Sequence, residues 1–272
     1  MRLITILLVC LPILGYAGGE NNPPGARSGG MANAGLNFTD IWSIYHNQAG
    51  LGYIEGPTAA VFYENKFLIN NFAYAGFAGA LPLGNGTIGV SYTNFGYSAY
   101  KESSIGLAYG MKLSEKFAVG VRLNYHSIRI DADGYGNKGA LTADVGFRLQ
   151  VSERVSLAAH LANPTRTKLN DFDDERIPTI IRFGAGYEIS DDLLATAEVE
   201  KDIDMNPIFR AGIEYQPADI LFLRVGASSN PGLFAFGFGL NFDAFKVDLS
   251  TTYHSVLGYS PQIALTYAPG KK

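Results

Sequence analysis

The sequence predicts an all-β protein: a transmembrane antiparallel β-barrel of about 14 strands with an N-terminal plug in its lumen. Three observations predict this fold. An export signal opens the chain, apolar and small residues alternate with a period of two through most of it, and short turns alternate with longer connections. The 272 residues include 32 Gly, 17 Phe and 16 Tyr, and only 17% are charged.

The first 17 residues resemble a secretory signal. Arg2 precedes an apolar run, and small residues follow at Gly15 and Ala17, so cleavage is expected after Ala17. The run is too short to anchor the chain in a membrane. A lipid-attached Cys10 is a weaker alternative, because it leaves too short an apolar run before the cysteine. Cleavage would remove this single cysteine, so no disulfide framework is expected, and no basic block suits nucleic acid.

The segment 18–57 is expected to form the plug. In "DIWSIYHNQAGLGYI" (40–54), Asp40 is placed like a helix N-cap, and Ile41, Ile44 and Tyr45 follow at helical spacing. Alone, such a helix could pack on the outside of a soluble sheet. If the exterior of a barrel faces lipid, the helix is expected to pack inside the lumen. The plug residues singled out are Asp40, Trp42, Ile44, Tyr45, His46, Asn47, Gln48 and Gly50.

The segment 58–268 is expected to form the barrel, followed by a periplasmic tail at 269–272. The stretch 117–126 is typical: it places large apolar side chains on one face and small or polar ones on the other. A soluble β-sandwich also alternates, but its outer face would be consistently polar. Here the second face is rich in Gly and Ala, which suits a crowded lumen, while Phe, Leu and Tyr suit a lipid-facing exterior.

The connections support the same topology. Short turns are predicted at 82–86, 114–116, 152–154, 190–192, 216–219 and 243–244. Longer loops are predicted at 94–103, 131–138, 163–178, 202–207, 228–232 and 255–260. Outer-membrane barrels have short periplasmic turns and longer external loops. This predicts an integral protein of the bacterial outer membrane with both termini in the periplasm and with membrane lipid around it.

Charged side chains on the predicted inward face are balanced in sign. They are Arg122, Asp144, Arg148, Arg182, Glu188, Glu198, Glu200, Arg210, Glu214, Arg224, Lys246 and Asp248. A lining of a single sign would favour an ion-selective pore. A balanced lining favours an interior filled by ion pairs, with a hydrated polar conduit as the alternative.

No motif indicates an enzyme, a metal site or a cofactor site. His126, His160 and His254 are expected to face the lumen, but their spacing does not force them together. Neither a nucleophile elbow nor a P-loop is present. The acidic residues Asp171, Asp173, Asp174 and Glu175 lack the spacing of a calcium loop and are expected in a solvated external loop.

The opening stretch 25–54 resembles that of the FadL long-chain fatty-acid transporter superfamily, and more closely its PorV/PorQ branch. Gly25-Ala26-Arg27, Met31–Ala34, Asp40, Tyr45 and Asn47–Leu51 correspond to its motifs, and "IPTIIRFGAGY" (177–187) resembles a later family strand. Gln48 departs from the proline that is usual there, and Tyr267 stands in for a terminal aromatic residue.

The resemblance implies a barrel of fourteen strands with an internal hatch. It also implies a plugged scaffold subunit of an outer-membrane export complex of the type IX secretion kind, with protein partners. The alternative function is passive transport of small hydrophobic molecules, and a barrel enzyme is the weakest hypothesis because no residue is nominated as the nucleophile. Any apolar pocket is expected around Trp42, Ile44 and Tyr45, because the inward strand faces supply few large apolar residues.

Overall fold

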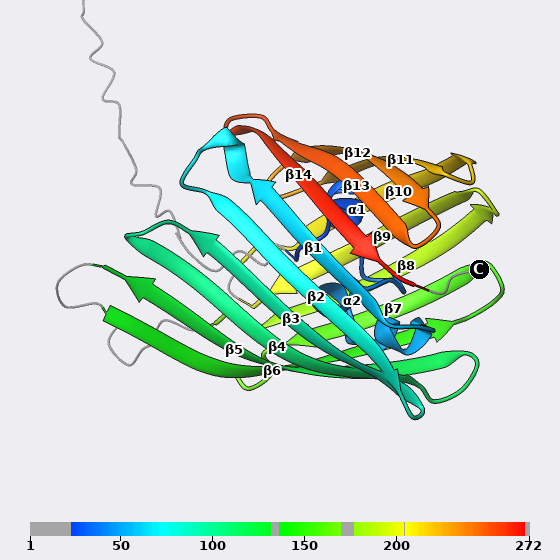
Figure 1. Cartoon of the computed structure of the whole chain (residues 1–272), viewed down its shortest axis with the longest axis horizontal. Coiled ribbons are helices and arrows are strands. Elements are labelled where there is room, and N and C mark those ends of the chain that lie inside the picture. Colours follow the sequence, from blue (N-terminus) through cyan, green and yellow to red (C-terminus); the bar gives the residue numbers. More distant parts are fainter. Residues whose placement is uncertain (1–22, 132–135, 170–176, 204, 270–272) are drawn as a thin grey trace, which may run out of the picture.

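The computed structural model describes residues 23–131, 136–169, 177–203 and 205–269. Within them the chain forms a closed antiparallel barrel in which every strand pairs with its sequence neighbours and β14 pairs with β1 (Figure 1). The predicted fold class is therefore confirmed. Closure leaves no unpaired strand edge, as a wall in lipid requires.

The strands are β1 (Thr58–Asn65), β2 (Ala73–Leu83), β3 (Gly86–Gly96), β4 (Tyr100–Lys112), β5 (Phe117–Ile130), β6 (Gly136–Gln150), β7 (Val155–Ala162), β8 (Ile180–Ser190), β9 (Leu193–Asp202), β10 (Ile208–Ala218), β11 (Leu221–Ser228), β12 (Leu233–Phe242), β13 (Phe245–His254) and β14 (Gly258–Tyr267). Short helical turns are α1 (Ala26–Gly29), α2 (Ser43–His46), η1 (Gln48–Tyr53) and η2 (Lys66–Leu68).

The two ends of the barrel differ. At one end the connections are tight, for example residues 191–192 between β8 and β9 and 243–244 between β12 and β13. β1 begins and β14 ends at this short-turn end (Figure 1). The prediction of a long loop at 94–103 is wrong. β3 runs to Gly96 and β4 starts at Tyr100, so only residues 97–99 connect them. Polar residues such as Lys101 pair in the ladder as readily as apolar ones, so the hairpin extends past the apolar band.

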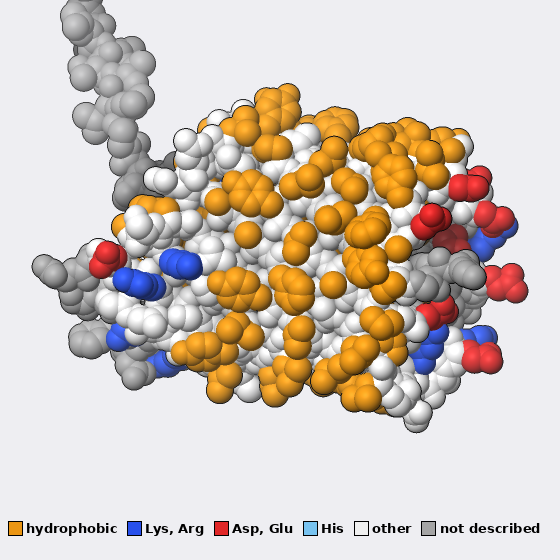
Figure 2. All heavy atoms as spheres, viewed as in Figure 1, with side chains coloured by type: hydrophobic (Ala, Val, Ile, Leu, Met, Phe, Trp, Pro, Cys, Tyr) orange, Lys and Arg blue, Asp and Glu red, His pale blue; other side chains and the backbone are white. Residues whose placement is uncertain are grey.

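The exterior is apolar and the interior is small or polar. Large apolar side chains such as Leu123, Phe183 and Phe236 are exposed on the outer face of their strands. Figure 2 shows hydrophobic side chains spread over the middle of the barrel, with Lys, Arg, Asp and Glu gathered at its two ends. This is the distribution expected of a wall surrounded by lipid. No helix among the described residues is long and apolar enough to span a membrane.

Residues 23–57, called the plug from here on, lie inside the barrel (Figure 1). Most residues up to Leu51 are buried, whereas 52–57 are half-buried or exposed where the chain runs into β1, and the plug contacts strands around the wall. Inward glycines make room for them: a Cβ on Gly120 would lie 2.2 Å from the backbone of Gln48, and one on Gly146 would lie 2.0 Å from Oδ1 of Asn47. The small lumen face of the strands therefore accommodates the plug backbone directly.

Candidate functional site

The plug is held by short turns rather than by one long helix. α2 begins at Ser43, so Asp40 does not cap it as predicted. The Asp40 carboxylate instead accepts a hydrogen bond from the backbone N–H of Trp42 at 2.9 Å and pairs with Arg27 at 2.8 Å. One carboxylate oxygen of Asp40 thus closes a local turn while the other ties this turn to Arg27.

One side of the plug is apolar. Ile41, Trp42, Ile44, Tyr45 and Leu51 are all buried and belong to one hydrophobic cluster. They pack against a set of wall residues on β14, β1, β2 and β4, which we call the apolar wall: Ala60, Phe62, Ala78, Ala80, Ala108 and Ala264. The ring centroids of Trp42 and Phe62 are 6.1 Å apart in an edge-to-face arrangement. Small alanines on the wall thus leave room for large plug side chains.

The Tyr45 hydroxyl provides polar contact on this side. It lies within hydrogen-bond distance of the carbonyl oxygens of Phe77 on β2 and Tyr92 on β3, the latter at 3.0 Å. The hydroxyl therefore anchors the apolar side of the plug at the β2–β3 seam.

The other side of the lumen carries most of the buried charges, apart from Glu64 on β1, and the strand register pairs them. Arg122 lies opposite Asp144, and their side chains meet at 2.8 Å. Arg210 lies opposite Glu198 and also reaches Glu200 at 2.9 Å. Opposite charges facing each other across a ladder stabilise the pairing of the two strands.

Arg182 and Arg224 complete this network. Both are fully buried. Arg182 pairs with Glu198 and Glu200, and Arg224 pairs with Glu214 and, at 2.7 Å, with Asp248. Buried ions of this kind are tolerated only when paired and hydrogen-bonded. We call the inward charges of β5, β6, β8 to β11 and β13 the polar wall.

Three predicted members of the charge network have other surroundings than the buried ion pairs described above. Glu188 is exposed at the short-turn end, beside an irregularity in the β8–β9 register, and does not reach the buried network. Arg148 is buried, but it donates to the carbonyl of Asn37 at 3.2 Å and lies over the Tyr53 ring. Lys246 is half-buried over the ring of Phe222.

The plug is tied to the polar wall by charge-assisted bonds. Arg27 reaches Glu214 on β10 at 2.6 Å, Arg122 donates to the carbonyl of Ile44 at 2.9 Å, and the backbone N–H of Leu36 donates to Glu198 at 3.1 Å. Arg27 was outside the predicted site residues. The sequence does contain a sign of this role, because Arg27 is the only charged residue between 21 and 39 and would need a partner in the lumen.

The polar plug residues act as structural ties. His46 shares a 2.9 Å hydrogen bond with the Ser28 hydroxyl, and burial together with nearby Arg182 holds the pKa of His46 well below its usual value, so the ring is neutral. Asn47 donates to the carbonyl of Phe147 on β6 at 3.0 Å. Gln48 donates to the carbonyl of Ile44 at 3.0 Å.

Gly50 must be glycine, because an added Cβ would lie 2.3 Å from the carbonyl oxygen of Phe38.

The histidines of the strands do not form a common site. His126 contacts the Thr142 hydroxyl at 3.0 Å, and His254 accepts from two amides of the β13–β14 turn. His160 is buried on β7. Across the described parts of the chain, no group of three or more His, Cys, Asp or Glu is placed to hold a metal. The acidic stretch 171–175 lies outside the described residues.

Comparisons with known proteins extend these observations. No protein-family model and no curated protein matches the chain. Among solved structures, the monoaromatic hydrocarbon channel CymD aligns with a TM-score of 0.71 at 14% identity, covering 90% of this chain and 97% of that chain. The toluene transporter TbuX of Ralstonia pickettii aligns with a TM-score of 0.70 at 12% identity, covering 90% and 98%.

A FadL homologue from Pseudomonas aeruginosa aligns with a TM-score of 0.62 at 11% identity, again covering 90% of this chain and 98% of that chain. The chain has a FadL-like fold. Identities this low establish a shared fold and not a shared substrate. The PorV/PorQ branch stays a prediction from the sequence.

Proposed function

We propose that this chain is an integral outer-membrane channel for the passive transport of small hydrophobic molecules, closed by its plug. The observation that carries this function is the division of the lumen into an apolar and a polar wall. The fold neighbours support it, since two of them are described as a hydrocarbon channel and a toluene transporter. This favours the transport alternative over the scaffold interpretation, and these neighbours are channels rather than enzymes.

The division of the lumen suggests where a ligand would pass. On the polar wall, Arg27, Arg122 and Glu198 hold the plug by directional, charge-assisted bonds. On the apolar wall the contacts are mainly non-directional, with Tyr45 as the polar exception. A hydrophobic molecule can replace apolar contacts without leaving a buried charge unpaired, whereas water or an ion cannot. The ligand path therefore follows Trp42, Ile44 and the apolar wall.

Uptake measurements test this function. Cells carrying the protein in their outer membrane should take up the hydrophobic fluorophore N-phenyl-1-naphthylamine faster than cells carrying an empty vector. Liposomes containing the purified barrel should stay impermeable to small sugars in a swelling assay. Uptake at the empty-vector rate by cells with folded barrel would contradict the proposal, and so would sugar permeation equal to that of a general porin.

Orientation follows from the same proposal. Both ends of the barrel chain lie at the short-turn end, which we assign to the periplasm, with the signal cleaved after Ala17. Accessibility of engineered cysteines to an impermeant maleimide tests this assignment. A cysteine at Asn85 should be protected in intact cells, and one at Val256 should be labelled.

A second candidate is the scaffold subunit that the PorV/PorQ resemblance implies. The observation that favours it is a set of apolar side chains exposed at the end opposite the short turns, with Val256 83% exposed and Leu68 60% exposed. Affinity purification from solubilised outer membranes separates the two functions. A stoichiometric large partner supports the scaffold, whereas a lone barrel contradicts it.

A further inference from the structure

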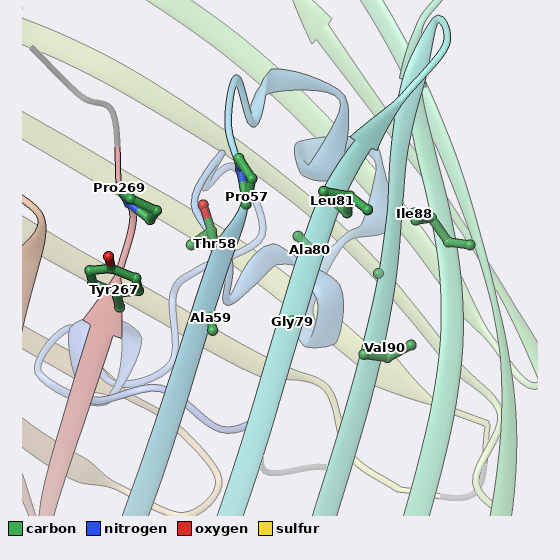
Figure 3. A pocket seen from close by; sticks show the side chains of 11 residues that line it. Pro57, Thr58, Ala59, Gly79, Ala80, Leu81, Ile88, Val90, Tyr267 and Pro269 are labelled. Atoms are coloured by element: carbon green, nitrogen blue, oxygen red, sulfur yellow. The ribbon is translucent and has the colours of Figure 1, made fainter.

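The outer wall of the barrel carries a groove that is separate from the lumen. Its volume is about 410 Å³, within the range of small-molecule sites. It crosses β14, β1, β2 and β3 near the short-turn end, and Figure 3 shows Ala59 and Gly79 between Tyr267 and Pro269 on one side and Leu81, Ile88 and Val90 on the other.

The strand register builds this groove. Tyr267 pairs with Ala59, Ala59 with Gly79, and Gly79 with Val90, so one row crosses four strands. The two ends of the row are large and exposed, and its centre is small. Side chains at directly opposed positions point to the same face, so the row forms a trough with two raised edges on the outside of the barrel.

The chemistry of the lining selects an apolar occupant. Among its residues only Thr58 and Tyr267 carry a side-chain polar group, and none is charged. Such a lining offers dispersion contacts and burial of apolar surface but no partner for a charge.

The position selects the source of that occupant. The groove opens onto the exposed apolar exterior, which continues along β1 and β2 through Val61 and Phe77. Its edge at Tyr267 belongs to an aromatic pair with Phe245, whose ring centroid is 4.8 Å away. Aromatic residues near the ends of the strands mark the level of the lipid headgroups. A lipid chain entering from that level would run directly into the trough.

We propose that this groove binds one acyl chain of a membrane phospholipid from the leaflet at the short-turn end. Ordinary lipid contacts along a flat wall exchange with their neighbours. A chain seated between Tyr267 and Val90 is enclosed on both sides as well as behind, so this lipid stays with the barrel through detergent extraction. The site lies on the outside of the wall and does not depend on the transport function.

Native mass spectrometry of the full-length mature barrel tests this proposal, with palmitoyl-oleoyl phosphatidylethanolamine as the probe. Ala59→Phe fills the centre of the trough with a ring. The matched control is Ala143→Phe, since Ala143 is also a half-buried alanine on the outer face, but on β6. Binding of the first lipid should weaken at least about tenfold in Ala59→Phe, and the control should stay within about twofold of the unmodified protein.

Folding is checked by the heat-dependent migration of the barrel on gels, and Ala59→Leu provides a smaller filling group if the Phe variant does not fold. Equal first-lipid affinity in a folded Ala59 variant and the unmodified barrel would overturn the proposal. Binding of hexadecane with no binding of the phospholipid would also overturn it, because the occupant would then be a free hydrocarbon. Either result leaves the fluorophore uptake assay as an independent test of transport.

Discussion

Replacing Trp42 by Ala should open the plug on its apolar side. Trp42 is 1% exposed, and its ring contacts Tyr45 and Phe62. Truncating a buried Trp to Ala costs about 3–5 kcal/mol when its surroundings do not collapse onto the space. Trp42 lies on the plug and the ladder lies on the wall, so the barrel should persist while the plug–wall association weakens.

The size of this effect can be measured. At about 1.4 kcal/mol per factor of ten, the population with a displaced plug should rise by roughly two to three and a half powers of ten. Planar bilayer recordings should then show new conductance events, and uptake of the hydrophobic fluorophore should accelerate. The control is Trp42→Phe, which retains an aromatic ring in the cluster; the indole N–H has no hydrogen-bond partner among the described residues. A folded Trp42→Ala barrel with traces as silent as those of the unmodified protein would refute the reasoning.

Three further perturbations address the other contacts of the plug. Arg27→Met breaks its ion pairs with the wall and within the plug, which should cost about 3–5 kcal/mol and increase cleavage within residues 23–57 by an added protease; unchanged protection would contradict the tie. Gly146→Val would force a side chain into Asn47 and should also raise conductance, whereas Gly232→Ala, with open space around it, should leave the recordings unchanged. Because burial keeps the pKa of His46 below its usual value, the packed plug favours the neutral ring. The stability of the packed plug should therefore be complete above about pH 6.5 and fall as the pH drops below that value. Conductance should therefore increase from pH 7 to pH 5, and His46→Gln should reduce that increase; an identical pH response in this variant would exclude His46 as its source.

The alternation made the barrel predictable, because a one-residue slip in a lipid-exposed strand would move every inward charge to the outside. Arg122 and Asp144 illustrate this: their positions in the period of two assign both to the lumen, and the register then places them opposite each other. The loop at 94–103 was mispredicted because the alternation was used to locate the ends of the strands. Polar residues interrupt the apolar period, but they do not interrupt a backbone ladder that continues beyond the lipid.

The contacts of the plug could not be read from local sequence. Asp40 looks like a helix cap because its neighbours have helical spacing, yet α2 begins only at Ser43, and the second carboxylate oxygen of Asp40 pairs with Arg27, thirteen residues earlier. Glu188 has the inward parity of β8, but it is the last residue before the register shifts and lies exposed at the short-turn end of the barrel. Both outcomes depend on partners that are distant in sequence or on the position of the residue along the barrel axis.

By itself, the sequence determined which face of each strand meets lipid and predicted lumen charges of both signs, because these properties depend on the period of a single strand. Only the tertiary structure decided that the lumen has an apolar and a polar wall, that Arg27 ties the plug to β10, and that a groove crosses the outside at Ala59 and Gly79. Each of these features is made by residues on two or more elements that are distant in sequence. Their juxtaposition is determined by closure of the barrel and the shear between its strands, which no single stretch of sequence contains.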